Sequence, residues 1–284
     1  MQLEYFLQGY IDTMITEFND AYKVARILYI DKELKRLPNL HKGYYGSQPV
    51  VREYGSGGRT LKTYYLTGDK NVEYAKLADR RSELTSLKKM ICSELKAVPS
   101  EYHVKLRACF KLRKEDWEKM RSQSNPKEIK GDLWYDDIHM RSRFEINTAI
   151  VLDSLGLEFK YEPEVIIGGR KKYPDFVVYL PEFEVCFIIE CMGKVGDPVY
   201  DSDSDNKLKL LMNGGFIPYR DFLVLGGSSD YIPTKEWVMN AVISVVNSIA
   251  SECVIPLTME VKSGLSMRFE LPPDIEQMLA RNWG

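Results

Sequence analysis

A continuously apolar run, Cys186-Phe-Ile-Ile189, is followed directly by Glu190. A run this short and this apolar predicts a strand that is buried on both faces, as in a sheet covered by helices. A carboxylate at the end of such a strand is costly to bury without a partner. Glu190 is therefore a candidate functional residue, and the alternative is an ordinary solvated strand end.

The segments around this strand alternate between helical and strand patterns. Helices are expected over 142–155, 205–214 and 237–249, and strands over 157–162, 165–167, 173–179, 183–189 and 221–225. Strands interspersed with helices in this order predict an α/β fold, with a mixed sheet that is covered by helices.

The first 130 residues follow another pattern. Helices are expected over 3–18, 22–37, 72–95 and 101–122, and two β-rich runs, 49–54 and 60–66, flank a glycine-rich turn and predict a hairpin. We therefore expect a helical region with a β-hairpin over 1–130, in contact with nucleic acid, and the α/β domain over 131–284.

The formal net charge of −2 hides an uneven distribution along the 284 residues. Residues 76–130 hold 15 basic and 8 acidic side chains, whereas residues 131–230 hold 10 basic and 18 acidic ones. A basic block beside an acidic block is typical of a nucleic-acid footprint next to a metal site. The alternative is that the lysines and arginines solvate exposed helix faces.

Several classes of protein are disfavoured. No apolar run reaches the roughly 18–20 residues of a membrane span, and Glu4 and Asp12 interrupt the apolar N-terminal stretch, which is unlike a signal peptide. The five cysteines form no CxxC pair and the three histidines are far apart, which disfavours a zinc cluster and a disulfide framework. We expect a cytoplasmic protein with no membrane partner.

Two carboxylates can meet if neighbouring strands pair antiparallel. Asp175 begins the strand at 173–179, and Glu190 ends the next strand, so antiparallel pairing would place them side by side. Hard oxygen ligands of this kind suit Mg²⁺ or Mn²⁺. An aspartate after a proline also forms turns, which is the alternative for Asp175.

Three other groups of polar residues have two interpretations each. Two of these residues lie on expected helices: Glu145 early in the helix at 142–155, and Lys207 in the helix at 205–214. Each is either a candidate for the same site or an ordinary solvated helical residue. Asp201, Asp203 and Asp205 are read as loop and N-cap residues because the glycine and final glutamate of a calcium loop are missing. The tyrosines 44, 45, 64 and 65 suit base stacking, or cross-strand packing in the hairpin.

Four short segments between residues 141 and 225 carry a family resemblance. They are Arg141-Ser-Arg-Phe-Glu145, Gly156-Leu-Glu-Phe-Lys-Tyr-Glu162, Tyr173-Pro-Asp-Phe176 and Ile188-Ile-Glu190. In this order they resemble the PD-(D/E)XK nucleases, the restriction-endonuclease-like superfamily. The resemblance implies a mixed sheet flanked by helices, and a catalytic metal bound by the residues that match Glu145, Asp175 and Glu190.

The third motif of that family is an acid, any residue and a lysine, whereas this chain has Glu190-Cys-Met192. A subset of the family has the lysine on the following helix, and Glu190-Cys-Met-Gly193, Asp197-Pro-Val-Tyr200 and Lys207 are similar to that variant. The resemblance makes Lys207 the first choice for the catalytic lysine, with Lys194 second and Lys209 third. Lys207 would stabilise developing charge and orient the attacking water.

Together these features predict a Mg²⁺- or Mn²⁺-dependent endonuclease, a hydrolase that cuts DNA, as a homodimer or with a partner protein in a larger nucleic-acid-processing system. Direct DNA contacts are expected at Arg80, Arg81, Lys88, Lys89, Arg141 and Arg143. Because Met192 replaces the motif lysine, a catalytically inactive nucleic-acid-binding module on the same fold is the alternative. An interaction protein with neither activity is the third interpretation.

Overall fold

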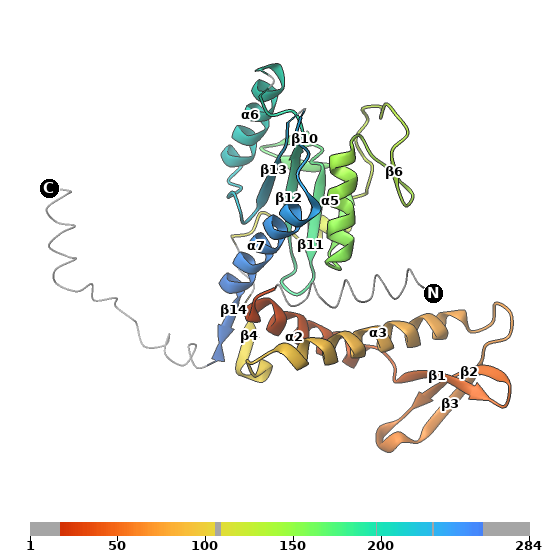
Figure 1. The fold of residues 1–284 in the computed structure, drawn as a ribbon. Coiled ribbons are helices and arrows are strands. Elements are labelled where there is room, and N and C mark those ends of the chain that lie inside the picture. The colour runs from red at the N-terminus through yellow and green to blue at the C-terminus, as the bar shows by residue number, and fades with distance from the viewer. Residues whose placement is uncertain (1–17, 106–108, 197, 229, 258–284) are drawn as a thin grey trace, which may run out of the picture.

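The computed structural model describes residues 18–105, 109–196, 198–228 and 230–257 (Figure 1). Its N-terminal elements are α2 (Asp20–Arg36), β1 (Leu40–Tyr45), β2 (Gln48–Tyr54), η1 (Ser56–Gly58), β3 (Thr60–Tyr65), α3 (Val72–Glu94), η2 (Pro99–Glu101), β4 (Tyr102–Val104), β5 (Leu112–Arg113) and α4 (Lys114–Lys119). The helix expected over 3–18 lies outside the described residues, apart from its last position.

The remaining elements are β6 (Trp134–Tyr135), β7 (Ile138–His139), α5 (Arg143–Ser154), β8 (Glu158–Tyr161), β9 (Val165–Ile167), β10 (Arg170–Lys172), β11 (Phe176–Leu180), β12 (Val185–Met192), α6 (Pro198–Asn213), β13 (Phe222–Gly226), α7 (Lys235–Cys253) and β14 (Val254–Pro256). The expected α/β class is confirmed.

The central sheet has the strand order β13-β12-β11-β8, and β5 pairs with the beginning of β12. β11 pairs antiparallel with both β8 and β12, whereas β12 and β13 run parallel. All eight residues of β12 are buried, as its apolar sequence predicts. The sheet is therefore mixed, with its longest strand in the interior.

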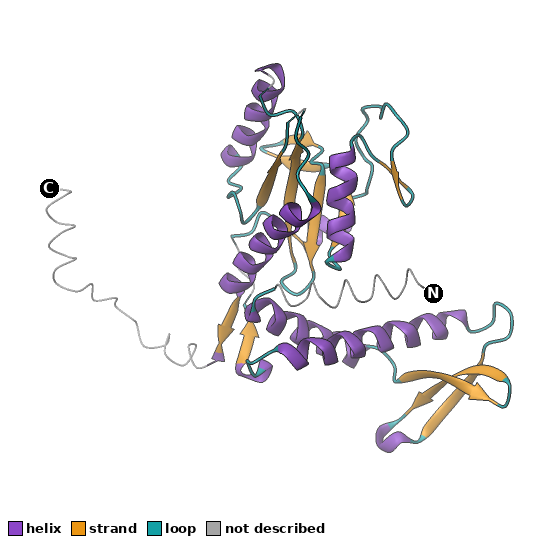
Figure 2. Cartoon of the chain, in the orientation of Figure 1, coloured by secondary structure: helices purple, strands orange, loops and turns teal. Residues whose placement is uncertain are grey.

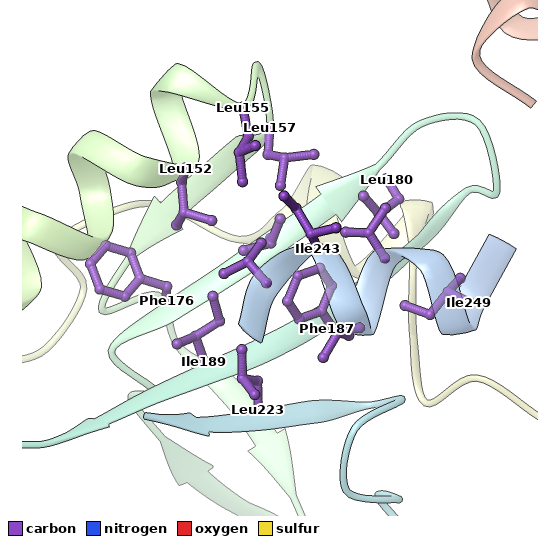
Figure 3. Packing of buried hydrophobic residues seen from close by; sticks show 14 of the residues in the cluster. Leu152, Leu155, Leu157, Phe176, Leu180, Phe187, Ile189, Leu223, Ile243 and Ile249 are labelled. Carbon is purple, nitrogen blue, oxygen red and sulfur yellow. The ribbon is translucent and has the colours of Figure 1, made fainter. Parts of the chain in front are cut away.

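Helices cover both faces of this sheet because alternate strand residues point to opposite sides. Phe176, Phe187 and Ile189 pack with α5 and α7 on one face, together with Leu152 and Ile243 (Figure 3). On the other face a second cluster joins residues from α6, α4 and β9 to the intervening strand positions, among them Val177, Ile188 and Leu211. Glu190 follows Ile188 by two positions and so points to the α6 face.

The N-terminal region holds a second, three-stranded antiparallel sheet in the order β1-β2-β3. It projects from one end of the antiparallel helices α2 and α3, away from the central sheet (Figure 2). The hairpin β2–β3 and helix α3 confirm the sequence-based expectation, whereas β1 was not expected. Leu40 of β1 packs with Val51, Tyr64 and Ala78, which fixes the sheet against α3.

The helix expected over 101–122 is wrong. This stretch instead forms β4, β5 and the short helix α4. β4 pairs with β14 and β5 pairs with β12, and such long-range pairing overrides the helical preference of a charged sequence. The same pairings mean that residues before 131 complete the β-structure of the second half.

The interpretation of Asp201, Asp203 and Asp205 as loop and N-cap residues is also wrong, because α6 begins at Pro198 and includes all three. All five cysteines lie in the described ranges and none forms a disulfide. None of the helices in the described part of the chain combines the length and the apolar character that crossing a membrane requires.

Candidate active site

The antiparallel register of β11 and β12 brings Asp175 to Glu190. Phe176 faces Ile189 across the two strands, so the residue before Phe176 lies beside the residue after Ile189. The backbone N–H of Cys191 donates to Asp175 Oδ2 at 2.6 Å, which fixes this carboxylate at the strand end. The predicted juxtaposition of the two acids follows directly from the pairing.

Burial makes ionisation of these carboxyl groups energetically unfavourable. Glu190 is 2% exposed, and its burial, reinforced by the charge of Asp175, raises its pKa to about 8 against the opposing effect of Lys207. Burial likewise raises the pKa of Asp175, and Lys207 again opposes the shift. The site therefore favours an additional positive charge, which would keep both groups ionised.

Lys207 supplies part of that charge. Its position on α6 places Nζ in an ion pair with Glu190 Oε2, and the lysine side chain is 34% exposed. Lys194 and Lys209, the second and third choices, are exposed. The structure therefore brings the first-choice lysine into direct contact with a candidate ligand.

Glu145 lies on α5, close enough to Asp175 for the charge of that carboxylate to act on it. It is the third residue of α5, and it closes a capping box with Ser142: its Oε2 accepts from Ser142 N at 3.0 Å, and its own N–H donates to Ser142 Oγ at 3.2 Å. The same Oε2 accepts from Tyr161 Oη at 2.9 Å and from Arg141 N at 2.8 Å. Burial and the charge of Asp175 raise the pKa of Glu145 to about 7.

A further buried acid, Glu162, was not expected in the site. It directly follows β8 and is 4% exposed, and its charge contributes to the raised pKa of Asp175. Arg141 donates to it through Nε at 2.7 Å and Nη2 at 3.1 Å, and Asn125 donates at 2.6 Å. The available signal was its place at the end of the strand expected over 157–162, like the place of Glu190 after its apolar run.

The six residues expected to contact DNA fall into two groups. Arg80, Lys89 and Arg143 are exposed. The other three are engaged within the protein: Arg141 with Glu162, Arg81 with the carbonyls of Leu34 and Leu37 at the end of α2, and Lys88 with Asp31 at 2.5 Å. All three residues of the first group are open to solvent, although Arg80 also forms an exposed ion pair with Glu83 at 3.9 Å. The second group holds elements together.

A groove of about 730 Å³ borders Lys207. It is lined by Asn125, Arg170, Lys172, Tyr173, Asn206, Lys207, Lys209, Leu210 and Asn213. Four of these side chains are cationic and none is a carboxylate. The β9–β10 hairpin brings Arg170 and Lys172 to α6, and the basic run after the Gly168-Gly169 turn was the available signal.

The carboxylates of the site offer oxygen donors to a divalent metal ion. Among the described residues, no three His, Cys, Asp or Glu side chains are grouped so that they could hold a metal ion together. Mg²⁺, however, is commonly held by one or two carboxylates, with water and substrate phosphate completing its shell. Asp175 and Glu190 fit that requirement, and Glu145 as a third ligand stays a prediction.

Comparisons with protein-family models, with curated proteins and with solved structures gave no match.

Proposed function

We propose that this protein is a metal-dependent nuclease of the PD-(D/E)XK type that hydrolyses phosphodiester bonds in DNA. One observation carries the proposal: antiparallel strands bring Asp175 and Glu190 together, and Lys207 joins them beside a cationic groove. The order α5, β8, β11, β12, α6, β13, with β13 parallel to β12, supports a restriction-endonuclease-like arrangement.

The residues divide the work as follows. Asp175 and Glu190 would hold Mg²⁺ or Mn²⁺, which when bound polarises a phosphoryl oxygen and acidifies a water molecule. Lys207 balances the charge of Glu190 and, at the edge of the groove, is placed to stabilise negative charge on a phosphate. Arg170 and Lys172 would hold the flanking phosphates of the strand.

A second candidate is a nucleic-acid-binding module without cutting activity. It is favoured by Met192, which stands where the family has lysine and is 8% exposed at the end of β12. In that case the ion pair of Lys207 with Glu190 would only neutralise a buried acid. Binding by the groove would then be independent of metal.

Incubation with supercoiled DNA in Mg²⁺, Mn²⁺ or EDTA tests the choice. We expect cutting with either metal and none in EDTA. Lys207→Ala should lower the cutting rate by about a hundredfold, the typical loss for one charge-stabilising donor, while Lys194→Ala retains the wild-type rate. Salt-sensitive binding without cutting would favour the second candidate, and a loss confined to Lys194→Ala would move the catalytic assignment to Lys194.

Removing the two hairpin cations that line the groove, Arg170 and Lys172, should weaken DNA binding and its salt dependence. In the Arg170→Ala/Lys172→Ala variant the slope of log K against log salt should become shallower by about 2, since each lost phosphate contact removes about one unit. Fluorescence anisotropy in EDTA measures this without cutting. Lys32→Ala/Lys35→Ala is the matched control, because it removes the same charge from α2, which lies far from α6 (Figure 1). Equal slopes for both double variants would show that the groove does not bind the backbone.

A further inference from the structure

We propose that the outer face of the three-stranded sheet β1–β3 binds an unpaired nucleic-acid strand by stacking bases on Tyr45 and Tyr65. The outer face is defined here as the side opposite α3, with the side chains of His41, Tyr45, Val50, Arg52, Tyr54, Leu61, Thr63 and Tyr65. Its separation from the central sheet (Figure 2) makes binding there distinguishable from cutting at the carboxylates.

The register assigns the tyrosines to opposite faces. Val51 pairs with Tyr64, and both pack in the cluster that includes Ala78 of α3, so they point inward. Their neighbours Val50 and Tyr65, which pair with each other, therefore point outward. Tyr64 is 8% exposed and stacks on Tyr74 at 3.8 Å between ring centroids. Of the two interpretations given for the tyrosines, packing therefore applies to Tyr64.

Tyr45 and Tyr65 remain open to solvent. They are 63% and 42% exposed, and their ring centroids lie 6.1 Å apart in an edge-on arrangement. Val50, which pairs with Tyr65, is fully buried although it points outward. The two rings are therefore supported from below by the sheet while ring surface stays exposed.

The charge of this surface fits a polyanion. In the described range 40–65, no aspartate or glutamate points to the outer face, because Glu53 turns inward and accepts from Tyr64 Oη at 2.9 Å. Arg52 lies on the outer face, paired with His41, and its Nη2 donates to the carbonyl of Tyr44 at 2.7 Å. A guanidinium fixed beside exposed rings suits a phosphate next to a stacked base.

These features favour an unpaired strand over a duplex. Base–aromatic stacking needs an exposed base face, which single strands offer and paired bases inside a helix do not. Across the projecting sheet, the rings, the arginine and the absence of carboxylates provide the combination that strand-binding sheets use: stacking for the bases and positive charge for the backbone.

The test is anisotropy with fluorescein-labelled oligothymidylate and with a duplex of equal length, in EDTA and at one salt concentration. We expect the wild type to prefer the single strand. Tyr45→Leu/Tyr65→Leu should raise the Kd at least about thirtyfold, because each stacked base contributes roughly one to three kcal/mol. Leucine keeps a large apolar side chain at both positions, so this variant tests stacking rather than folding. Tyr45→Phe/Tyr65→Phe should retain wild-type affinity.

Tyr44→Ala is the matched control. Tyr44 is 70% exposed and adjacent in sequence, but it points to the opposite face, so its loss should leave the Kd unchanged. Equal affinity of the wild type for single strand and duplex would overturn the proposal, as would unchanged binding in the leucine variant. Neither result depends on whether the protein cuts DNA.

Discussion

Asp175→Asn should abolish metal-dependent cutting while leaving the fold intact. The asparagine side-chain oxygen can still accept the hydrogen bond from Cys191 N that Asp175 Oδ2 accepts at 2.6 Å, so the local geometry should be preserved. What is lost is the negative charge that a divalent ion requires. Mutation of residues that only support the ligands of a metal site typically lowers metal affinity or activity by about 10–100-fold. We therefore expect the loss of a ligand itself to lower the cutting rate by more than about a hundredfold.

The same variant should not be less stable than the wild type without metal. The charge of Asp175 raises the pKa values of Glu190 and Glu145, which means that it is repelled by both when all are ionised. Its removal relieves that repulsion. Thermal melting should therefore show an equal or higher Tm in EDTA, and Mg²⁺ should stabilise the wild type more than Asp175→Asn, because only binding to the folded state raises stability.

Glu158→Gln is the control, since it removes an exposed carboxylate from β8 of the same sheet. It should cut at the wild-type rate. A cutting rate of Asp175→Asn within about tenfold of the wild-type rate would contradict the assignment of Asp175 as a metal ligand. Such a result would mean that metal-dependent cutting needs no negative charge at this position.

Glu182→Ala should destabilise the protein by about 3–5 kcal/mol, the typical cost of leaving a buried charge without its partner. The Glu182 side chain is fully buried in the turn between β11 and β12, where Oε1 accepts from Arg26 Nη1 and from Tyr22 Oη at 3.5 Å. Both partners lie on α2, so this one acid joins the N-terminal helices to the central sheet. Urea unfolding measures the effect.

Two further variants separate charge from packing at this point. Arg26→Met/Glu182→Leu should recover much of the loss, because replacing both buried ions by apolar groups removes the desolvation cost. Glu83→Ala, which breaks the exposed pair of Arg80 and Glu83 on α3, should change stability by less than about 1 kcal/mol. If Glu182→Ala behaves like Glu83→Ala, the buried pair contributes nothing to the joint.

The parts predicted best from the sequence are those fixed by local patterns. The apolar run before Glu190 and the proline before Asp175 indicated two strands, and the antiparallel pairing of these strands places the two acids together. Helices α3, α5 and α7 were equally clear, because periodicity and stop signals lie within the segment itself.

The missed features depend on partners far away in the sequence. Strand β5 is too short to be recognised alone and forms only because β12 offers its edge 73 residues later. Arg141 reads as a surface cation until Glu162 is known to lie beside it, and the cationic groove exists only once the β9–β10 hairpin meets α6. The residue types alone do not indicate which distant segments come into contact in the fold.

The pairing of β4 with β14 and of β5 with β12 has a consequence for how such chains can diversify. An exchange of the first 130 residues between related proteins would replace two strands that the second half needs, together with the α2 partners of Glu182. A viable chimera must therefore inherit matching edges on both sides of the junction. Variation is easier at the projecting sheet β1–β3, which can change its surface without disturbing β11 and β12, whose pairing brings Asp175 to Glu190.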